Sequence, residues 1–396
     1  MRKKSISMLK NVLALFLGSV LALAMMEGIF RVYQPFEFRV KANKIVLPAH
    51  KEYIIPSDKS DKLDNLIVHR KNSLGFRGAE KPADFEKSLS VIAIGGSATE
   101  CFYLSDDKTW PHLLGEKLKK KFNPFWINNA GLDGHSTFGH IALLENHVFK
   151  IKPKVVLFLV GSIDIQRENP NPFDDRTALG KLSRHSVKGW LVSAANQSEV
   201  FALAINVFRY YKGRNMRRPN PIDFKNRRTL EMSPEIRAQT LILDNQRYLL
   251  PYENRLRRLI LLCRQNDIEP ILVTHPMLFG DVIDDVTRVD LGRIDVSQIL
   301  REIGAAPKGS TNGLFQWEQL EMYNDVTRRV GKKEKIHLVD LARELPKSTR
   351  YYYDSMHYGN EGAAKVAEIL YDRLAPYLAK KYPGHYHPER RSSDEE

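Results

Sequence analysis

Five short apolar runs, rich in β-branched residues and separated by helical patterns, most constrain how this chain can fold. The runs are Leu89 to Ile94, Phe125 to Asn129, Val155 to Val160, Ile268 to Thr274 and Ile336 to Leu341. Runs without a polar face are typical of buried parallel strands, because helices cover both faces of such a sheet. The alternation therefore predicts an α/β fold with a five-stranded parallel sheet.

Helical patterns fill the connections between these runs. Thr109 and Ser136 stand at expected N-cap positions, ahead of helices that reach to about Lys121 and Lys150. Three further helices are predicted at roughly Pro234 to Gln265, Trp317 to Arg329 and Asn360 to Lys380. In a parallel sheet the ligand crevice lies beyond the carboxyl ends of the strands, so residues that follow the runs are expected to share one site.

Residues with the chemistry of a serine nucleophile occupy these positions. Ser97 follows the first run in Gly95-Gly96-Ser97-Ala98-Thr99, and Asp354-Ser355-Met356-His357 follows the fifth. A serine hydroxyl becomes an effective nucleophile when an imidazole removes its proton and a carboxylate orients that imidazole. We therefore predict Ser97 as the nucleophile, His357 as the base and Asp354 as the orienting acid. Gly134 and Ser162 follow the second and third runs at the same edge.

These motifs resemble the conserved blocks of SGNH/GDSL hydrolases, which are flavodoxin-like three-layer α/β/α sandwiches. Residues 89–164 and 330–375 carry the resemblance: the Gly-Gly-Ser block, the segment Asn129-Ala130-Gly131-Leu132-Asp133-Gly134-His135-Ser136, and Asp354-x-x-His357 followed by Gly359 to Ala364. The resemblance implies that the backbone N–H groups of Ser97 and Gly134 form an oxyanion hole.

The third block departs from the family pattern. Members usually have Gly-x-Asn-Asp, whereas this chain has Gly161-Ser162-Ile163-Asp164. An isoleucine cannot donate a hydrogen bond, and loss of one oxyanion donor costs about 10²- to 10³-fold in rate. The hydroxyl of Ser162 is the expected replacement donor. Reduced activity is the expectation, and a silent site is the alternative.

The amino terminus has the pattern of a membrane anchor. Arg2, Lys3, Lys4 and Lys10 precede an apolar run from Val12 to Phe30, in which Glu27 is the only charged residue. A helix of this length rises about 28 Å, close to the ~30 Å hydrocarbon core of a bilayer. The basic end predicts a single-pass protein whose catalytic body is extracytoplasmic, either periplasmic or at the cell surface. Ala22-Leu23-Ala24 leaves open a cleaved signal peptide and a secreted protein.

The expected organisation has four parts. They are an anchor at residues 1–33, an irregular lead-in at 34–86, a hydrolase-like domain at 87–382 with an insertion at 166–233, and a polar tail at 383–396. Asn72-Ser73-Leu74-Gly75-Phe76-Arg77-Gly78 in the lead-in resembles a segment that precedes the first block in membrane-anchored relatives. The insertion carries aromatic and basic residues between Phe208 and Arg218, and we expect it to act as a lid or a partner surface.

Charge and composition exclude several classes of function. The formal net charge is +14, densest between Arg209 and Arg228, and it favours anionic lipid headgroups or an acidic glycan. No motif for nucleic-acid, dinucleotide or P-loop binding is present. His135, His140 and His147 lack the spacing of helical metal ligands, so neither a metal nor another cofactor is expected. Cys101 and Cys263 supply no disulfide framework, and Cys101 is interpreted as a small packed residue.

The sequence thus predicts an extracytoplasmic, membrane-anchored serine esterase or O-acyl hydrolase. The resemblance implies substrates with ester-linked acyl groups, including O-acetylated carbohydrate and lipid esters. The first alternative is an O-acyltransferase acting on a cell-surface glycan or lipid. The second is a catalytically weak or silent glycan-binding or assembly component. Membrane lipid is the expected partner of the N-terminal helix.

Overall fold

The computed structural model describes residues 2–33, 40–41, 44–45, 47–57, 60–170, 174, 197–201, 203, 222–302 and 309–388. The chain divides into two compact units. The first comprises Met1–Val46 and Asp175–Arg217, and we call it the helical unit. The second comprises Leu47–Asp174 and Arg218–Glu396, and we call it the α/β unit.

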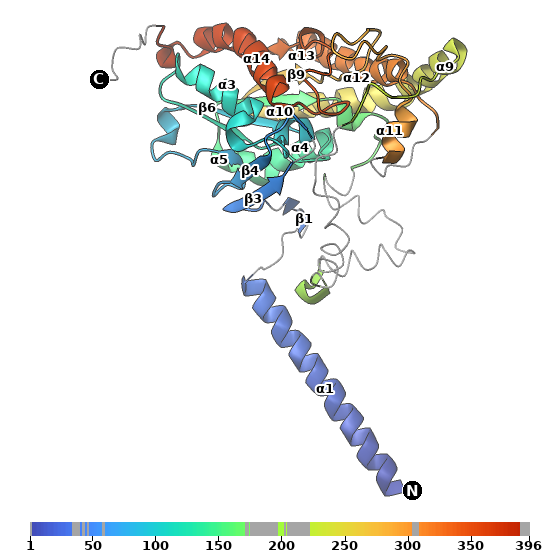
Figure 1. The fold of residues 1–396 in the computed structure, drawn as a ribbon. Coiled ribbons are helices and arrows are strands. Elements are labelled where there is room, and N and C mark those ends of the chain that lie inside the picture. The colour runs from blue at the N-terminus through green and yellow to red at the C-terminus, as the bar shows by residue number, and fades with distance from the viewer. Residues whose placement is uncertain are drawn as a thin grey trace. The chain divides into compact units, whose positions relative to one another are not determined.

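A six-stranded sheet forms the centre of the α/β unit (Figure 1). Its strand order is β10-β9-β8-β6-β7-β5. The strands are β5 (Arg77–Gly78), β6 (Leu89–Gly95), β7 (Phe125–Asn129), β8 (Val155–Val160), β9 (Glu269–Thr274) and β10 (Leu338–Val339). The five predicted parallel strands are confirmed, and their order is the flavodoxin-like one. The last is shorter than predicted, since Leu341 already begins helix α13 (Leu341–Glu344).

The sixth strand, β5, was not predicted. It pairs antiparallel with β7 through Arg77 opposite Asn129 and Gly78 opposite Asn128. The prediction of an irregular lead-in is also wrong in part, because β3 (Lys51–Pro56) and β4 (Leu66–Lys71) form an antiparallel hairpin there. A two-residue strand carries no periodic pattern, so its pairing is decided by tertiary contacts.

Helices cover both faces of the sheet. Helix α3 (Trp110–Lys119) packs against α14 (Asn360–Lys381) on one side, and α10 (Leu250–Gln265) packs against α4 (Thr137–Leu143) and α12 (Gly313–Lys333) on the other. Both predicted N-caps are confirmed. Thr109 Oγ1 accepts a hydrogen bond from the His112 N–H (3.4 Å), and Ser136 Oγ accepts one from the Phe138 N–H (3.3 Å).

Two of the predicted helices are interrupted by π-helical turns. The helix after Ser136 continues from α4 through η3 (Leu144–Val148) into α5 (Phe149–Ile151). The long helix consists of α9 (Pro234–Asp244), η5 (Asn245–Leu249) and α10. The remaining short elements of the unit are η1 (Phe85–Lys87), α2 (Ser97–Glu100), η2 (Asp106–Lys108), η4 (Ser162–Asp164), α11 (Val296–Glu302) and η6 (Pro383–His385).

Much of the predicted insertion lies outside the described residues. This holds for 171–173, 175–196, 202 and 204–221, and therefore for the basic and aromatic run from Phe208 to Arg218. The described end of the insertion belongs to the α/β unit, where Ile222 and Phe224 join the buried core. Its role as a lid or partner surface stays a prediction.

The helical unit contains α1 (Arg2–Tyr33) and the two-residue strands β1 (Val40–Lys41) and β2 (Lys44–Ile45). Within the stretch Lys10–Tyr33, an 18-residue window has a mean hydropathy of 2.2, and none of that window is buried. Its 24 residues rise about 36 Å as a helix, which is enough to cross a bilayer. Near its end, Glu27 accepts hydrogen bonds from the Ser198 hydroxyl (2.8 Å) and the Val200 N–H (3.2 Å).

Candidate active site

Ser97 stands where β6 ends and the one-turn helix α2 begins. The turn is tight because glycine precedes it: a Cβ at Gly95 would lie 2.1 Å from Oγ1 of Thr99 and 3.1 Å from the carbonyl oxygen of Leu159. Gly96 caps α2, and its carbonyl accepts a hydrogen bond from the Glu100 N–H at 3.0 Å. The close approach of these segments presents the partly exposed Ser97 at the carboxyl edge of the sheet.

The three residues predicted as nucleophile, base and orienting acid lie in hydrogen-bonding contact. Oγ of Ser97 is 2.7 Å from Nε2 of His357, and Nδ1 of His357 is 2.6 Å from Oδ2 of Asp354. Ser97 and His357 are 260 residues apart in sequence, so the fold of the sheet brings them together. This arrangement is typical of serine hydrolases.

A compact turn between β10 and α14 holds the imidazole. The second carboxylate oxygen of Asp354 accepts hydrogen bonds from the N–H groups of Met356 and His357, both at 2.8 Å. The ring of His357 stacks on the ring of Tyr353, with centroids 5.7 Å apart and planes at 12°. The carbonyl of Ser355 accepts a hydrogen bond from the Leu278 N–H (3.0 Å), which ties the turn to the segment after β9.

The acid and the base shift each other's pKa in opposite directions. Desolvation disfavours the charged form of each group, but their mutual attraction and hydrogen bond outweigh it. The pKa of the Asp354 carboxyl is therefore lower than usual, and the pKa of the His357 imidazole is higher than usual. The site favours an ionised carboxylate beside an imidazole that readily takes up a proton.

The loop that carries Gly134 packs directly against the serine turn. Its Leu132 N–H donates to the carbonyl of Gly95 (3.0 Å), and Gly131 touches helix α2 so closely that a Cβ would lie 2.3 Å from the Glu100 nitrogen. Gly134 has a φ of 72°, a left-handed conformation that favours glycine. The predicted donor loop and the predicted nucleophile are thus neighbours.

Ile163 occupies the place beside the serine turn where the family resemblance implies asparagine. Its Cγ1 would lie 3.3 Å from a Cβ on Gly96, so an apolar side chain faces the residue next to Ser97. Ser162 lies on the same turn, η4, at the end of β8.

Asp164, the last residue of that block, is a buried structural group. It accepts hydrogen bonds from the N–H (3.2 Å) and the hydroxyl (2.6 Å) of Thr137 and pairs with Arg255 at 3.1 Å. Burial raises the pKa of its carboxyl despite these partners. Asp164 therefore fixes the start of α4.

Two residues near the site were not predicted. His275 directly follows β9, and its Nδ1–H donates a hydrogen bond to the carbonyl oxygen of Pro276 (2.8 Å). Burial lowers the pKa of its imidazole to about 4. The exposed carboxylate of Asp133 lies close enough to His357 to favour the protonated imidazole. His275 is the third polar residue to follow a strand of the sheet, and this position is the signal that could have identified it.

The other candidate residues have packing roles or lie elsewhere. Cys101 is buried, its Sγ donates to the carbonyl of Ala98 (3.3 Å), and burial raises the pKa of its thiol to about 12. His135 and His140 are buried. Within the described part of the chain, no group of three or more His, Cys, Asp or Glu residues is arranged to hold a metal ion.

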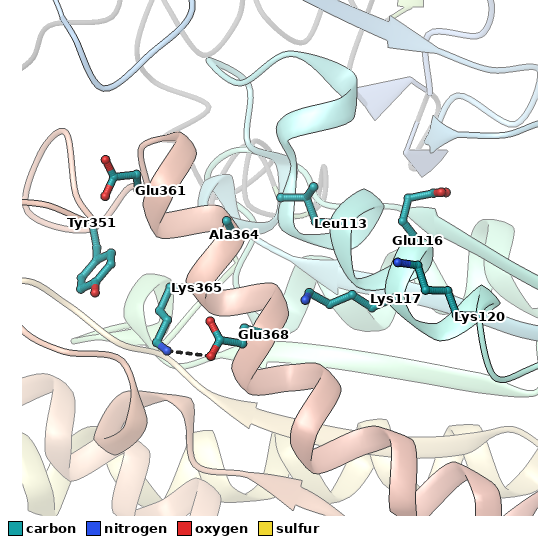
Figure 2. A pocket seen from close by; sticks show the side chains of 9 residues that line it. All are labelled: Leu113, Glu116, Lys117, Lys120, Tyr351, Glu361, Ala364, Lys365 and Glu368. Carbon is teal, nitrogen blue, oxygen red and sulfur yellow. Dashed lines mark hydrogen bonds and ion pairs between the residues drawn. The ribbon is translucent and has the colours of Figure 1, made fainter. Parts of the chain in front are cut away.

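A surface groove of about 450 Å³ lies between α3 and α14 (Figure 2). Its walls carry charged side chains such as Lys117 of α3 and Glu368 of α14, and the latter pairs with Lys365 at 2.9 Å. The lining residues do not include Ser97, Asp354 or His357. The groove is therefore a feature separate from the candidate active site.

The protein has an α/β fold, and Ser97, His357 and Asp354 lie in an arrangement typical of serine hydrolases. The model of the GDSL-like Lipase/Acylhydrolase family matches residues 93–365, which is more than half of the chain. The chain therefore belongs to the GDSL-like lipase/acylhydrolase family. The matched span contains Ser97, Gly134, Asp354 and His357.

Comparison with solved structures finds matches at low identity. An acetylxylan esterase from Geobacillus stearothermophilus is 14% identical, with 72% of this chain and 94% of that chain covered and a TM-score of 0.38. A GDSL-like lipase from Bacteroides thetaiotaomicron VPI-5482 is 12% identical, with coverage of 76% and 93% and a TM-score of 0.35. No curated protein sequence matches the chain.

Proposed function

We propose that this protein is a membrane-anchored serine esterase that hydrolyses ester-linked acyl groups. The observation that carries the proposal is the continuous hydrogen-bonded chain from Ser97 Oγ through His357 to Asp354, at 2.7 and 2.6 Å. Nucleophile, base and orienting acid need this order and these distances. Membership of a lipase/acylhydrolase family supports ester bonds as the target.

The proposed reaction uses each group in turn. His357 removes the hydroxyl proton as Ser97 Oγ attacks the ester carbonyl, and Asp354 stabilises the resulting imidazolium. The negative charge on the carbonyl oxygen is taken up by the N–H groups of Ser97 and Gly134, with the Ser162 hydroxyl as a third donor. His357 then protonates the departing alkoxide, and the acyl group remains on Ser97. Water activated by His357 releases the acid and restores the enzyme.

The test compares detergent-solubilised full-length protein with two serine variants on a chromogenic acetyl ester. Ser97→Ala removes the proposed nucleophile, and Ser233→Ala is the matched control because that serine is exposed outside the site. We expect Ser97→Ala to lose at least about 10³-fold in kcat. A fluorophosphonate loses fluoride as Ser97 Oγ bonds to phosphorus. It should label the wild type and Ser233→Ala but not Ser97→Ala. Equal hydrolysis by wild type and Ser97→Ala would reject the proposal.

A specific observation favours a second candidate function. Ile163 lies against the serine turn and cannot donate a hydrogen bond to an oxyanion. A protein that keeps the fold but uses it to hold an acylated glycan or lipid, as a binding or assembly component, has no need of that donor. Failure of the wild type both to hydrolyse the ester and to react with the fluorophosphonate would favour this candidate.

We further propose that helix α1 holds the α/β unit on the extracytoplasmic side of a membrane. Support comes from the apolar stretch Lys10–Tyr33 and from the basic residues Arg2, Lys3 and Lys4 ahead of it. An alkaline phosphatase fused after Glu396 in a bacterial host should be active, and the fusion should stay in alkali-washed membranes. A soluble product that begins at Met25 would show cleavage after Ala24 instead.

A further inference from the structure

A buried ion pair joins the lead-in segment to the serine turn. Nζ of Lys71, at the end of β4, lies 3.3 Å from Oε1 of Glu100, and the two side chains are only 3% and 9% exposed. Glu100 is the last residue of α2, the helix that begins with Ser97. Its other oxygen, Oε2, accepts a hydrogen bond from the Asp133 N–H at 2.6 Å. One carboxylate thus connects the serine helix to the residue that precedes Gly134.

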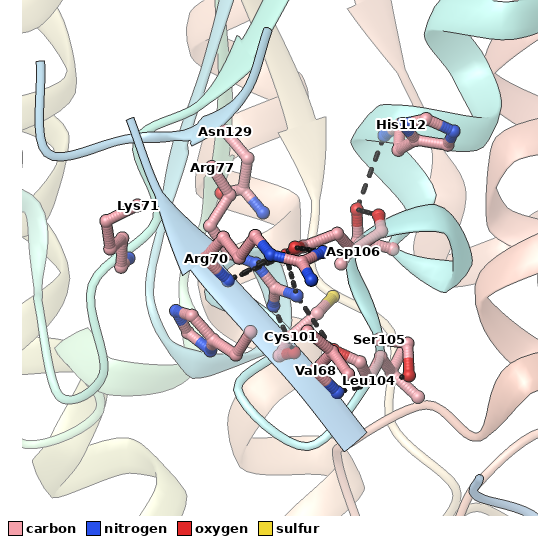
Figure 3. Close-up of polar contacts among 12 residues, drawn as sticks. Val68, Arg70, Lys71, Arg77, Cys101, Leu104, Ser105, Asp106, His112 and Asn129 are labelled. Carbon is pink, nitrogen blue, oxygen red and sulfur yellow. Dashed lines mark hydrogen bonds and ion pairs between the residues drawn. The ribbon is translucent and has the colours of Figure 1, made fainter. Parts of the chain in front are cut away.

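A second cation from the lead-in holds the backbone of the same turn. The guanidinium of Arg77, in β5, is 2% exposed and surrounded by the end of α2 and the segment that follows (Figure 3). It donates to the carbonyls of Glu100 (2.9 Å), Cys101 (2.6 Å) and Leu104 (2.7 Å) and pairs with Asp106 (2.8 Å). These bonds add charge-assisted donors to carbonyls at and after the helix end. The backbone at Glu100 is therefore held by Arg77 while its side chain is held by Lys71.

Stability alone is a poor explanation for the buried pair. Desolvation of two charges offsets most of their attraction, and apolar replacements of similar volume often stabilise a protein as much. A charge-assisted hydrogen bond is, however, short and directional, so it fixes the position of the N–H that it accepts. Here that N–H belongs to Asp133, one residue before Gly134.

We propose that Glu100 is a positioning residue for the oxyanion donor. Its carboxylate holds the loop Gly131–Gly134 where the Gly134 N–H meets the developing oxyanion, and Lys71 holds that carboxylate in place. The inference rests on the proposed esterase function. It adds a role for the lead-in segment, which contributes no group to the reaction itself.

The test uses full-length protein in detergent and two double variants. Lys71→Met/Glu100→Gln removes both charges but keeps an amide oxygen that can accept from the Asp133 N–H. Lys71→Met/Glu100→Met removes the charges and the acceptor with little change in volume. We expect kcat for the acetyl ester to be about 10- to 100-fold lower in the second variant than in the first, with KM within about threefold.

A boronic acid separates positioning from a general loss of structure. Its boron bonds to Ser97 Oγ, the hydroxyl proton passes to His357, and the tetrahedral anion occupies the oxyanion site. The boronic acid should bind the Lys71→Met/Glu100→Met variant more weakly than the Lys71→Met/Glu100→Gln variant, by the same factor as the difference in kcat. The Tm values of the two variants should agree within about 3 °C. The matched control applies the same substitutions to the exposed pair Lys119–Glu116, where the ratio of kcat values should be one.

The outcomes are distinct for this inference and for the proposed function. An active wild type with equal kcat in the two Lys71/Glu100 variants overturns the positioning role alone. A lower kcat in the Lys71→Met/Glu100→Met variant that comes with a Tm more than about 3 °C lower and an unchanged boronic acid affinity also overturns the positioning role. A wild type no more active than Ser97→Ala overturns both.

Discussion

The side chain at position 163 limits how much charge the proposed oxyanion site can stabilise. Ile163 lies next to Gly96, within reach of the atoms that flank Ser97. We expect Ile163→Asn to raise kcat by about 10- to 100-fold, because its amide adds a donor of the kind whose loss costs about 10²- to 10³-fold. Steady-state kinetics on the acetyl ester measures the gain. Ile163→Val adds no donor and serves as the control; an equal rate in Ile163→Asn would mean that the missing donor does not limit the reaction.

We expect Asp354 to set the pH at which His357 acts as the proposed base. Desolvation lowers the pKa of His357, whereas the charge and hydrogen bond of Asp354 raise it above the usual value, so kcat/KM of the wild type should rise with pH through a midpoint above ~6.5. In Asp354→Asn those two contributions are lost and desolvation remains. The midpoint should therefore move to lower pH, while kcat falls by about 10³- to 10⁴-fold.

The measurement is kcat/KM across about pH 5 to 9 for both proteins. A midpoint that stays in place after Asp354→Asn would contradict the electrostatic role of that carboxylate. Asp133 also raises the pKa of His357, so Asp133→Asn provides a comparison. It should shift the midpoint downward without the large loss in kcat, because Asp133 does not hold the imidazole.

The three residues of the proposed catalytic triad were predictable because their sequence spacing and their positions after strands agree. Asp354 and His357 are three residues apart, so one turn suffices to pair them, and Ser97 directly follows a buried strand. His275 directly follows strand β9, and that position could have identified it. Asp133 was missed because its proximity to His357 depends on how separate loops fold toward one another, and such a contact leaves no local pattern in the chain.

Among the elements, the loop between β7 and α4 packs tightly against the serine helix α2. Gly131 packs against the backbone of α2, where a Cβ would lie 2.3 Å from the Glu100 nitrogen and 2.6 Å from the Thr99 carbonyl carbon. Backbone atoms cannot rotate away, so Gly131→Ala must shift the loop or the serine helix. We expect at least about a tenfold loss of kcat and about 1–3 kcal/mol of destabilisation.

Kinetics on the acetyl ester and denaturant unfolding measure the two effects. Gly384→Ala is the matched control, because a Cβ there meets no atom within 4 Å. If Gly131→Ala keeps the kcat and the stability of the wild type, the loop can move away from α2 without cost. That result would contradict the expectation that a Cβ at position 131 has no room.

The most deeply buried elements were the easiest to predict from the sequence. Strands β6 and β8 lie at the centre of the sheet and are buried along their whole length, so their continuous apolar runs were visible in the sequence. The hairpin β3–β4 has one buried and one exposed face, and β5 has only two residues. The π-helical turns η3 and η5 likewise continue a helical pattern without altering it, so the sequence predicted single helices.

At the scale of the whole molecule, the lead-in segment belongs to the structure that holds the site. Nζ of Lys62 donates to the carbonyl of Tyr352 (3.0 Å), next to the turn of His357. Asp64 accepts hydrogen bonds from the Ser105 hydroxyl (2.5 Å) and the Asn360 amide (2.8 Å), and so joins the segment after α2 to the start of α14. One segment therefore contacts the supports of both the serine and the histidine.

This arrangement predicts that the smallest active fragment begins before the sheet does. A fragment of residues 47–388 keeps the lead-in and should fold and hydrolyse the acetyl ester with kcat within about threefold of the full-length protein. A fragment of residues 87–388 lacks five further buried apolar side chains of the lead-in, Ile55, Leu63, Ile67, Phe76 and Phe85. At about 1.5–3 kcal/mol each, their loss of ~7.5–15 kcal/mol matches the ~5–15 kcal/mol that stabilises a typical domain.

The shorter fragment also leaves Glu100 buried without Lys71 and leaves the carbonyls at the end of α2 without Arg77, which adds to the cost. We expect it to be unfolded or aggregated at 25 °C, as judged by circular dichroism and size-exclusion chromatography, whereas the longer fragment should unfold cooperatively. A folded, active 87–388 fragment would mean that the sheet and its helices hold Ser97, His357 and the Gly134 loop together unaided. In that case the contacts of Lys62, Lys71 and Arg77 would be accessory to the site.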